Sequence, residues 1–230
     1  MITETNVFRN GERIPAFSQK STQQPTPKAL NKIEDAPDWT KLSCHQCEHC
    51  PLKTEEINWC PAALSIAACI KASSSWVSIE NVKLEMIDGN RRVIEQTTAS
   101  SALSSIFMNQ IVHSTCPVMK FDFWLWKYFS STLSIENVLF RRLATDLIYR
   151  DLSKVRNVDG ESTRIDPEDL VTILTNLTHR IRSAEELSGD AAPNALVSLS
   201  SLSTYSANFW AEIYDHLEEG LTQHKTLTTD

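Results

Sequence analysis

The sequence predicts a mainly α-helical (α+β) fold: a helical, bundle-like domain with one β-hairpin and a cysteine-rich metal knuckle near its N-terminus. Three observations predict it. Glycine occurs only five times in 230 residues, too rarely for a sandwich or barrel with many tight turns. Apolar residues recur at helical spacing in several segments. Four of the six cysteines lie between residues 44 and 60.

Composition divides the chain into three parts. Residues 1–38 are polar and rich in proline, so burial cannot offset the entropy of ordering them, and we expect a flexible tail. A single mostly helical domain is expected over residues 39–220, with the cysteine knuckle at 44–60. Residues 221–230 should fray.

Local patterns place the elements in chain order. Pro61 suits the first turn of a helix that continues to residue 72. Alternating apolar residues over 82–86, the turn residues 88–90 and a second extended run over 91–97 indicate a β-hairpin, whose apolar face must lie on helices. Helical spacing predicts the remaining helices, over residues 99–113, 134–152, 166–188 and 192–220.

The stretch from Cys44 to Pro61 predicts a metal site. Cys44, Cys47 and Cys50 are each separated by two residues, and a Cys-x-x-Cys turn aims two thiolates at one point, as in tetrahedral zinc sites. Four protein ligands would make the site structural, whereas three and a water would leave it open for chemistry. The candidate ligands are Cys44, His45, Cys47, His49, Cys50, Cys60 and Cys116.

An iron–sulfur cluster is the rival cofactor. Bacterial ferredoxins share the first two cysteine gaps and a final Cys-Pro, but nine residues separate Cys50 from Cys60 here, against three in those proteins. The nearby histidines also favour zinc. Free thiols in a reduced loop are the remaining alternative, because the polar residues 1–20 do not resemble a secretory segment and disulfides are rare in the cytosol.

The charge distribution and the motifs missing from the sequence exclude several classes of function. The net charge is −7, and residues 151–230 carry 14 acidic and 6 basic residues. No basic stripe and no long apolar run occur, so we expect no nucleic-acid or membrane partner and a cytoplasmic location. The phosphate-loop, His-Glu-x-x-His, nucleophile-elbow and dinucleotide motifs are missing from the sequence. His113, three residues before Cys116, is a weak candidate for a Cys–His pair.

A known family provides a resemblance. The stretches His45-Gln46-Cys47, Cys50-Pro51-Leu52, Cys60-Pro61, Leu103-Ser104-Ser105 and Cys116-Pro117 resemble an uncharacterised bacterial family of unknown function. The resemblance implies that Cys47, Cys50, Cys60 and Cys116 are the shared cysteines, which favours Cys116 over Cys44 as the fourth ligand. It implies no activity.

These observations predict a non-catalytic cytoplasmic module, stabilised by zinc, with an interaction or regulatory role. Its protein partner would bind the aromatic segment 121–129 or the acidic C-terminal third. The alternative is a metal- or thiol-dependent enzyme or an iron–sulfur redox protein.

Overall fold

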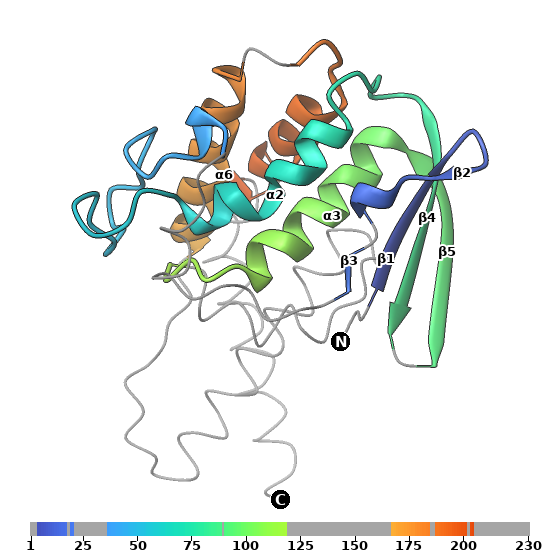
Figure 1. Cartoon of the computed structure of the whole chain (residues 1–230), viewed down its shortest axis with the longest axis horizontal. Coiled ribbons are helices and arrows are strands. Elements are labelled where there is room, and N and C mark those ends of the chain that lie inside the picture. The colour runs from blue at the N-terminus through green and yellow to red at the C-terminus, as the bar shows by residue number, and fades with distance from the viewer. Residues whose placement is uncertain are drawn as a thin grey trace, which may run out of the picture.

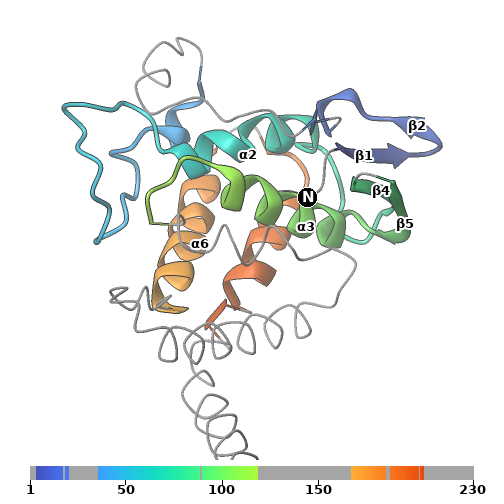
Figure 2. The ribbon, with the colours of Figure 1, turned by 90° about the horizontal axis from the view of Figure 1, so that it is seen from below.

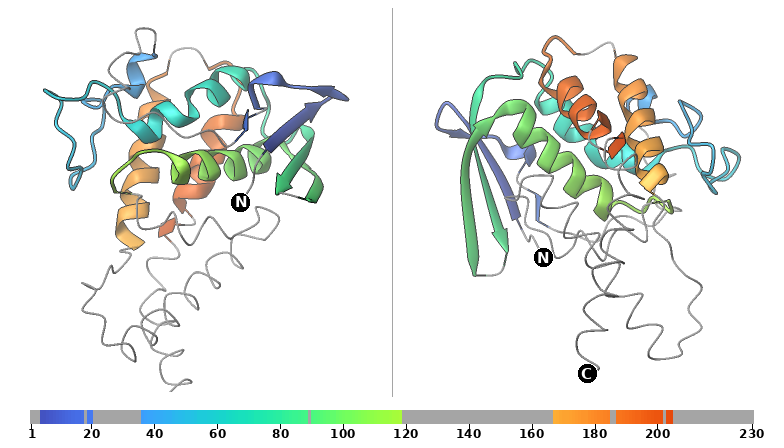
Figure 3. Two further views of the ribbon diagram at one scale, coloured as in Figure 1. Left: turned by 60° about the horizontal axis from the view of Figure 1, so that its bottom comes forward. Right: turned by 180° about the vertical axis from the view of Figure 1, so that it is seen from behind.

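The computed structural model describes residues 4–17, 19–20, 36–88, 90–118, 167–184, 187–201 and 203–204. These residues form a mixed α+β domain, with an antiparallel sheet at one side and helices on one face of the sheet (Figure 1). Helices α2 (Pro61–Ala72) and α3 (Ala99–His113) lie nearer the sheet. Helix α6 (Pro167–Arg182) and the helical residues 191–201 lie beyond them, as the views in Figures 2 and 3 show.

Strands β4 (Asn81–Asp88) and β5 (Arg91–Thr98) form the hairpin that the alternating pattern predicts, paired antiparallel along their whole length. The side chains of Val82, Leu84 and Met86 are buried, because the two-residue period of a strand directs all three to the same face. That face packs against the helices.

The prediction of a mainly helical, bundle-like fold is wrong, because the sheet extends well beyond one hairpin. Strand β1 (Glu4–Arg9) pairs antiparallel with β4, so the strands of the sheet follow the order β2-β1-β4-β5. The short strands β2 (Glu12–Arg13) and β3 (Gln19–Lys20) both pair with β1. A two-residue turn joins β1 to β2: Asn10 and Gly11 have φ of 53° and 84°, the left-handed conformation that tight hairpins require.

The first strands therefore belong to the sheet, although the sequence predicts a flexible tail over residues 1–38. Packing explains the difference. Val7 is fully buried, and Phe17, in the short 3-10 helix η1 (Pro15–Phe17), lies 5.2 Å from Trp76 between ring centroids. Burial of large apolar and aromatic side chains supplies the free energy that orders residues 4–17.

Helices α2 and α3 begin where their capping signals predict. Pro61 occupies the first turn of α2, and the Thr98 hydroxyl oxygen accepts a hydrogen bond from the Ser101 amide at the start of α3. Leu103, Phe107 and Ile111 of α3 are fully buried in the core.

The segment before residues 191–201 docks on the loop that follows α2. The Gly189 amide donates to the Ser74 carbonyl at 2.7 Å, and the Ser78 amide donates to the Asp190 carboxylate at 2.7 Å. A Cβ atom on Gly189 would lie 2.2 Å from the Trp76 carbonyl oxygen, so the close approach requires glycine.

Several predictions concern other parts of the chain. The aromatic segment 121–129, the helix over 134–152, the last helix beyond residue 204 and the fraying end 221–230 lie outside the described residues. Within the described ranges, no helix combines the length and the apolar character that a membrane span requires.

Candidate thiol site

The cysteine-rich segment is a loop that is closed at its base. Short 3-10 helix η2 (Asp38–Thr40) leads into it, and Lys41 and Trp59 form an antiparallel bridge. The Leu42 amide donates to the Asn58 carbonyl at 2.7 Å, and the Cys60 amide donates to the Thr40 carbonyl at 2.8 Å. These bonds hold the two ends of the loop side by side and so fix Cys60 relative to the earlier cysteines.

Within the loop, Cys47 and Cys50 lie on one tight turn. The Cys50 amide donates to the Cys47 carbonyl at 3.1 Å. The Gln46 side-chain amide donates to the Leu52 carbonyl at 2.8 Å and closes the turn from outside. The Cys-x-x-Cys spacing therefore produces the local turn that the sequence predicts for this pair.

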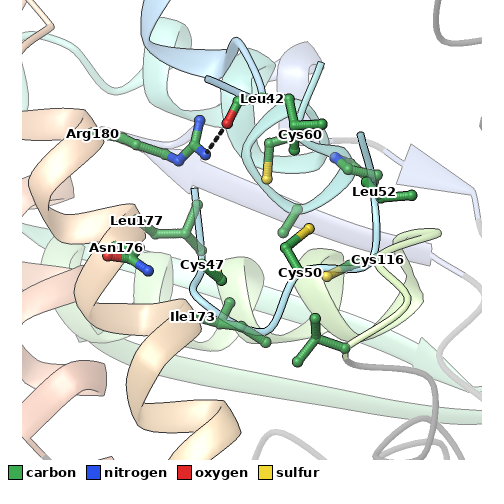
Figure 4. Close-up of a pocket in the computed structure, with 13 residues that line it drawn as sticks. Leu42, Cys47, Cys50, Leu52, Cys60, Cys116, Ile173, Asn176, Leu177 and Arg180 are labelled. Carbon is green, nitrogen blue, oxygen red and sulfur yellow. Dashed lines mark hydrogen bonds between the residues drawn. The ribbon is translucent and has the colours of Figure 1, made fainter. Parts of the chain in front are cut away.

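Four cysteines from three separate segments line one pocket. Cys47 and Cys50 come from the loop, Cys60 precedes the first residue of α2, and Cys116 follows α3. In Figure 4 the sulfur atoms of Cys50, Cys60 and Cys116 lie inside the bend that the cysteine loop makes. Packing of α2 against α3 brings Cys60 and Cys116 together, although 55 positions separate them in the sequence.

One face of α6 closes the pocket. Ile173, Asn176, Leu177 and Arg180 recur at intervals of three and four residues, so they share one side of the helix. The rest of the lining is mainly apolar and consists of Leu42, Leu52, Pro61, Ala62 and Val118.

The free space in the pocket is about 20 Å³. A volume of that size holds one water molecule or one ion.

The predicted metal knuckle over residues 44–60 is not present as an assembled site. Among the described residues, no group of three or more Cys, His, Asp or Glu side chains is arranged closely enough to hold a metal ion. Cys44 and His45, both candidate ligands, do not line the pocket. The exposed His45 ring instead stacks on His179 of α6, with 5.5 Å between ring centroids. Cys47, Cys50, Cys60 and Cys116 line one pocket although they come from distant parts of the sequence, and their assignment as metal ligands stays a prediction.

Burial in the pocket raises the pKa of two of its thiols, those of Cys47 and Cys60. Burial raises the pKa of the Cys47 thiol, and a hydrogen bond with Asn176 and the charge of Arg180 oppose that rise. Burial likewise raises the pKa of Cys60, against the charge of Arg180 and the amides of Ala63 and Ala62 at the start of α2. All six cysteines are free of disulfide bonds.

Arg180 is the most unusual residue at the site. It is 1% exposed and donates to the carbonyl oxygens of Trp39, Leu42 and His45 at 3.2, 3.3 and 3.2 Å, and also to that of Lys41. Within the part of the chain that the structure describes, no carboxylate forms an ion pair with it. Burying a guanidinium costs free energy, and carbonyl partners offset only part of that cost. The position of Arg180 beside the thiols therefore bears on what the pocket holds.

Cys69 and His113 lie outside the pocket. Cys69 lies in the core of α2, and burial raises the pKa of its thiol to about 12. His113 bonds through Nδ1 to the Asn109 carbonyl of its own helix at 2.7 Å and does not line the pocket. The Cys116–His113 pair stays a prediction.

Comparison with known proteins identifies a family. Residues 7–221 match the family model described as Domain of unknown function (DUF6901). The chain belongs to this family. The resemblance to an uncharacterised family is thus confirmed, while the shared cysteine pattern stays a prediction. No curated protein and no solved structure matches this DUF6901 chain.

Sequence reasoning missed two residues of the DUF6901 pocket, Asn176 and Arg180. Both are polar positions on a helix that the sequence predicts, and polar positions of a helix usually face solvent. No sequence signal marks them. The four pocket cysteines, by contrast, are those that the family resemblance implies.

Proposed function

We propose that Cys47, Cys50, Cys60 and Cys116 bind one zinc ion and that the domain is a non-catalytic interaction or regulatory module stabilised by that ion. The observation that carries the proposal is the gathering of four thiols from three segments around one small pocket. Cysteine is an infrequent residue in this chain, so four of the six lining the same pocket is the feature that supports a shared ligand.

The size and chemistry of the pocket favour zinc. A cavity of about 20 Å³ suits a single ion better than a four-iron cluster. Zinc is commonly bound by four cysteine thiolates in tetrahedral geometry, which is the ligand set that this pocket offers. Four protein ligands leave no open position for a substrate, which supports a structural role and a non-catalytic module.

Thiol chemistry and charge support a location and a type of partner. Thiol ligands persist in reducing compartments, which supports a cytoplasmic location. The acidic balance of residues 151–230 supports a protein partner with a basic surface.

Metal analysis of the purified protein tests the proposal. The wild type should contain one zinc per chain, and Cys60→Ser should lose the zinc and melt at a lower temperature, because metal affinity contributes to folding. Cys44→Ser is the matched control, since Cys44 lies outside the pocket. A brown, iron-containing protein would support the iron–sulfur alternative. A wild type that stays metal-free after incubation with zinc would refute the proposal.

A further inference from the structure

The buried charge of Arg180 points to what the pocket is built to hold. Its side chain is 1% exposed, and the described residues provide carbonyl oxygens but no carboxylate to balance it. Carbonyl dipoles offset part of the cost of burying a charge, but a full negative charge nearby offsets more.

A metal-loaded pocket would supply that negative charge. Four neutral thiols contribute none, whereas a divalent ion with four thiolates is negatively charged overall, because the thiolates outweigh the ion. Arg180 lines the same pocket as the four cysteines, and its charge acts on both Cys47 and Cys60.

We infer that Arg180 is a positioning and specificity-determining residue that makes the pocket select an anionic metal–tetrathiolate centre. This inference rests on the proposed function. Arg180 fastens the segment 39–45 to α6 through its four carbonyl bonds, and its charge stabilises the loaded site. Loading the pocket and attaching α6 to the cysteine loop are then coupled events.

Zinc affinity measured by competition with a chromogenic chelator tests the inference in four proteins: wild type, Arg180→Gln, Arg180→Lys and Arg182→Gln. Arg182 is the matched control, because it lies on the same helix and is exposed, so its substitution removes the same charge away from the pocket. Arg180→Gln should bind zinc about 10- to 100-fold more weakly, the usual effect of removing an outer-shell partner.

The Arg180→Lys variant separates the contribution of the positive charge to zinc affinity from that of the carbonyl hydrogen bonds. Lysine keeps the positive charge but loses the planar fork, so it should retain zinc affinity within about threefold of wild type while lowering thermal stability. A residue that acted only as a structural clamp would show the same loss of affinity with lysine as with glutamine.

The outcomes are distinct. If wild type binds zinc and Arg180→Gln matches Arg182→Gln, the inference is overturned and the proposed function stands. If Arg180→Gln does not fold, loss of zinc affinity in folded Arg180→Lys overturns the inference. A wild type that binds no zinc overturns the proposed function and this inference with it.

Discussion

Replacing Gly189 with alanine should destabilise the domain strongly, although the change adds one methyl group. The new Cβ would lie 2.2 Å from the Trp76 carbonyl oxygen and 2.6 Å from the Trp76 nitrogen and the Ser75 carbonyl carbon. All three are backbone atoms, so no side-chain rotation relieves the clash. Reaching ordinary van der Waals contact requires the two segments to separate by about 1 Å.

That separation would strain the hydrogen bonds that join the segments. The amides of Ser188 and Gly189 both donate to the Ser74 carbonyl, and the Ala191 amide donates to the Trp76 carbonyl. Each such bond contributes about 0.5–1.5 kcal/mol, and loss of two or three lowers the free energy of unfolding by roughly 2–4 kcal/mol.

Urea unfolding measures this change as a lower midpoint at an unchanged slope. Gly11→Ala is the matched control, because Gly11 has φ of +84° but nothing within 4 Å of the added Cβ. It should lose only about 1 kcal/mol from backbone strain. If Gly189→Ala costs no more than Gly11→Ala, the close docking of the segment before the helical residues 191–201 on the loop after α2 is refuted.

Three further predictions concern single side chains. Cys69→Ala should make the free energy of unfolding fall less steeply at alkaline pH. Burial raises the pKa of the folded Cys69 thiol to about 12, whereas a thiol in the unfolded chain titrates near about 8.5. Between these values, ionisation of the unfolded chain lowers the stability of the wild type by about 1.4 kcal/mol per pH unit. Urea unfolding from pH 8 to 11 compares the two slopes, and equal slopes would contradict the prediction. Hydrogen bonds from Ser78 hold the pKa of the Asp190 carboxyl below its ordinary value. The stability that this carboxylate contributes is therefore present above the pKa it has in the unfolded chain, and it is lost as the pH falls through the pKa of the folded state. Acid-unfolding curves should show that Asp190→Asn loses less stability on acidification than the wild type. Cys44→Ser should melt with zinc at the wild-type temperature, whereas Cys116→Ser should lose the zinc-dependent rise in melting temperature; an identical loss in both would mean that Cys44 is also a ligand.

Much of the local structure could be predicted from the sequence, because local signals decide it. The alternation of Val82, Leu84 and Met86 predicts β4, and Pro61 and Pro167 mark the first helical residues of α2 and α6. These features depend on neighbouring residues alone. Tertiary packing does not change them.

The N-terminal strands were missed for a physical reason. In β1 only Val7 is a fully buried aliphatic residue, while Asn6 faces the polar side of the sheet and bonds to Glu85. Composition therefore suggested a solvated tail. The Asn10-Gly11 pair was a usable signal, since Asn-Gly is a strong indicator of a two-residue hairpin turn.

The cysteines of the candidate site could be predicted from the sequence, but their arrangement around one pocket could not. Spacing marks Cys47 and Cys50 as a pair, and the family resemblance adds Cys60 and Cys116. Their meeting depends on how α2, α3 and α6 pack, which no local pattern encodes. Arg180 was unpredictable for the same reason, because an arginine near the end of a helix normally faces solvent.

X-ray absorption spectroscopy at the zinc edge of the zinc-loaded protein tests the central claim most directly, because it counts the atoms bound to the ion. Convergence of Cys47, Cys50, Cys60 and Cys116 predicts four sulfur neighbours at about 2.3 Å. A shell of nitrogen and oxygen neighbours, with two sulfurs or fewer, would contradict it.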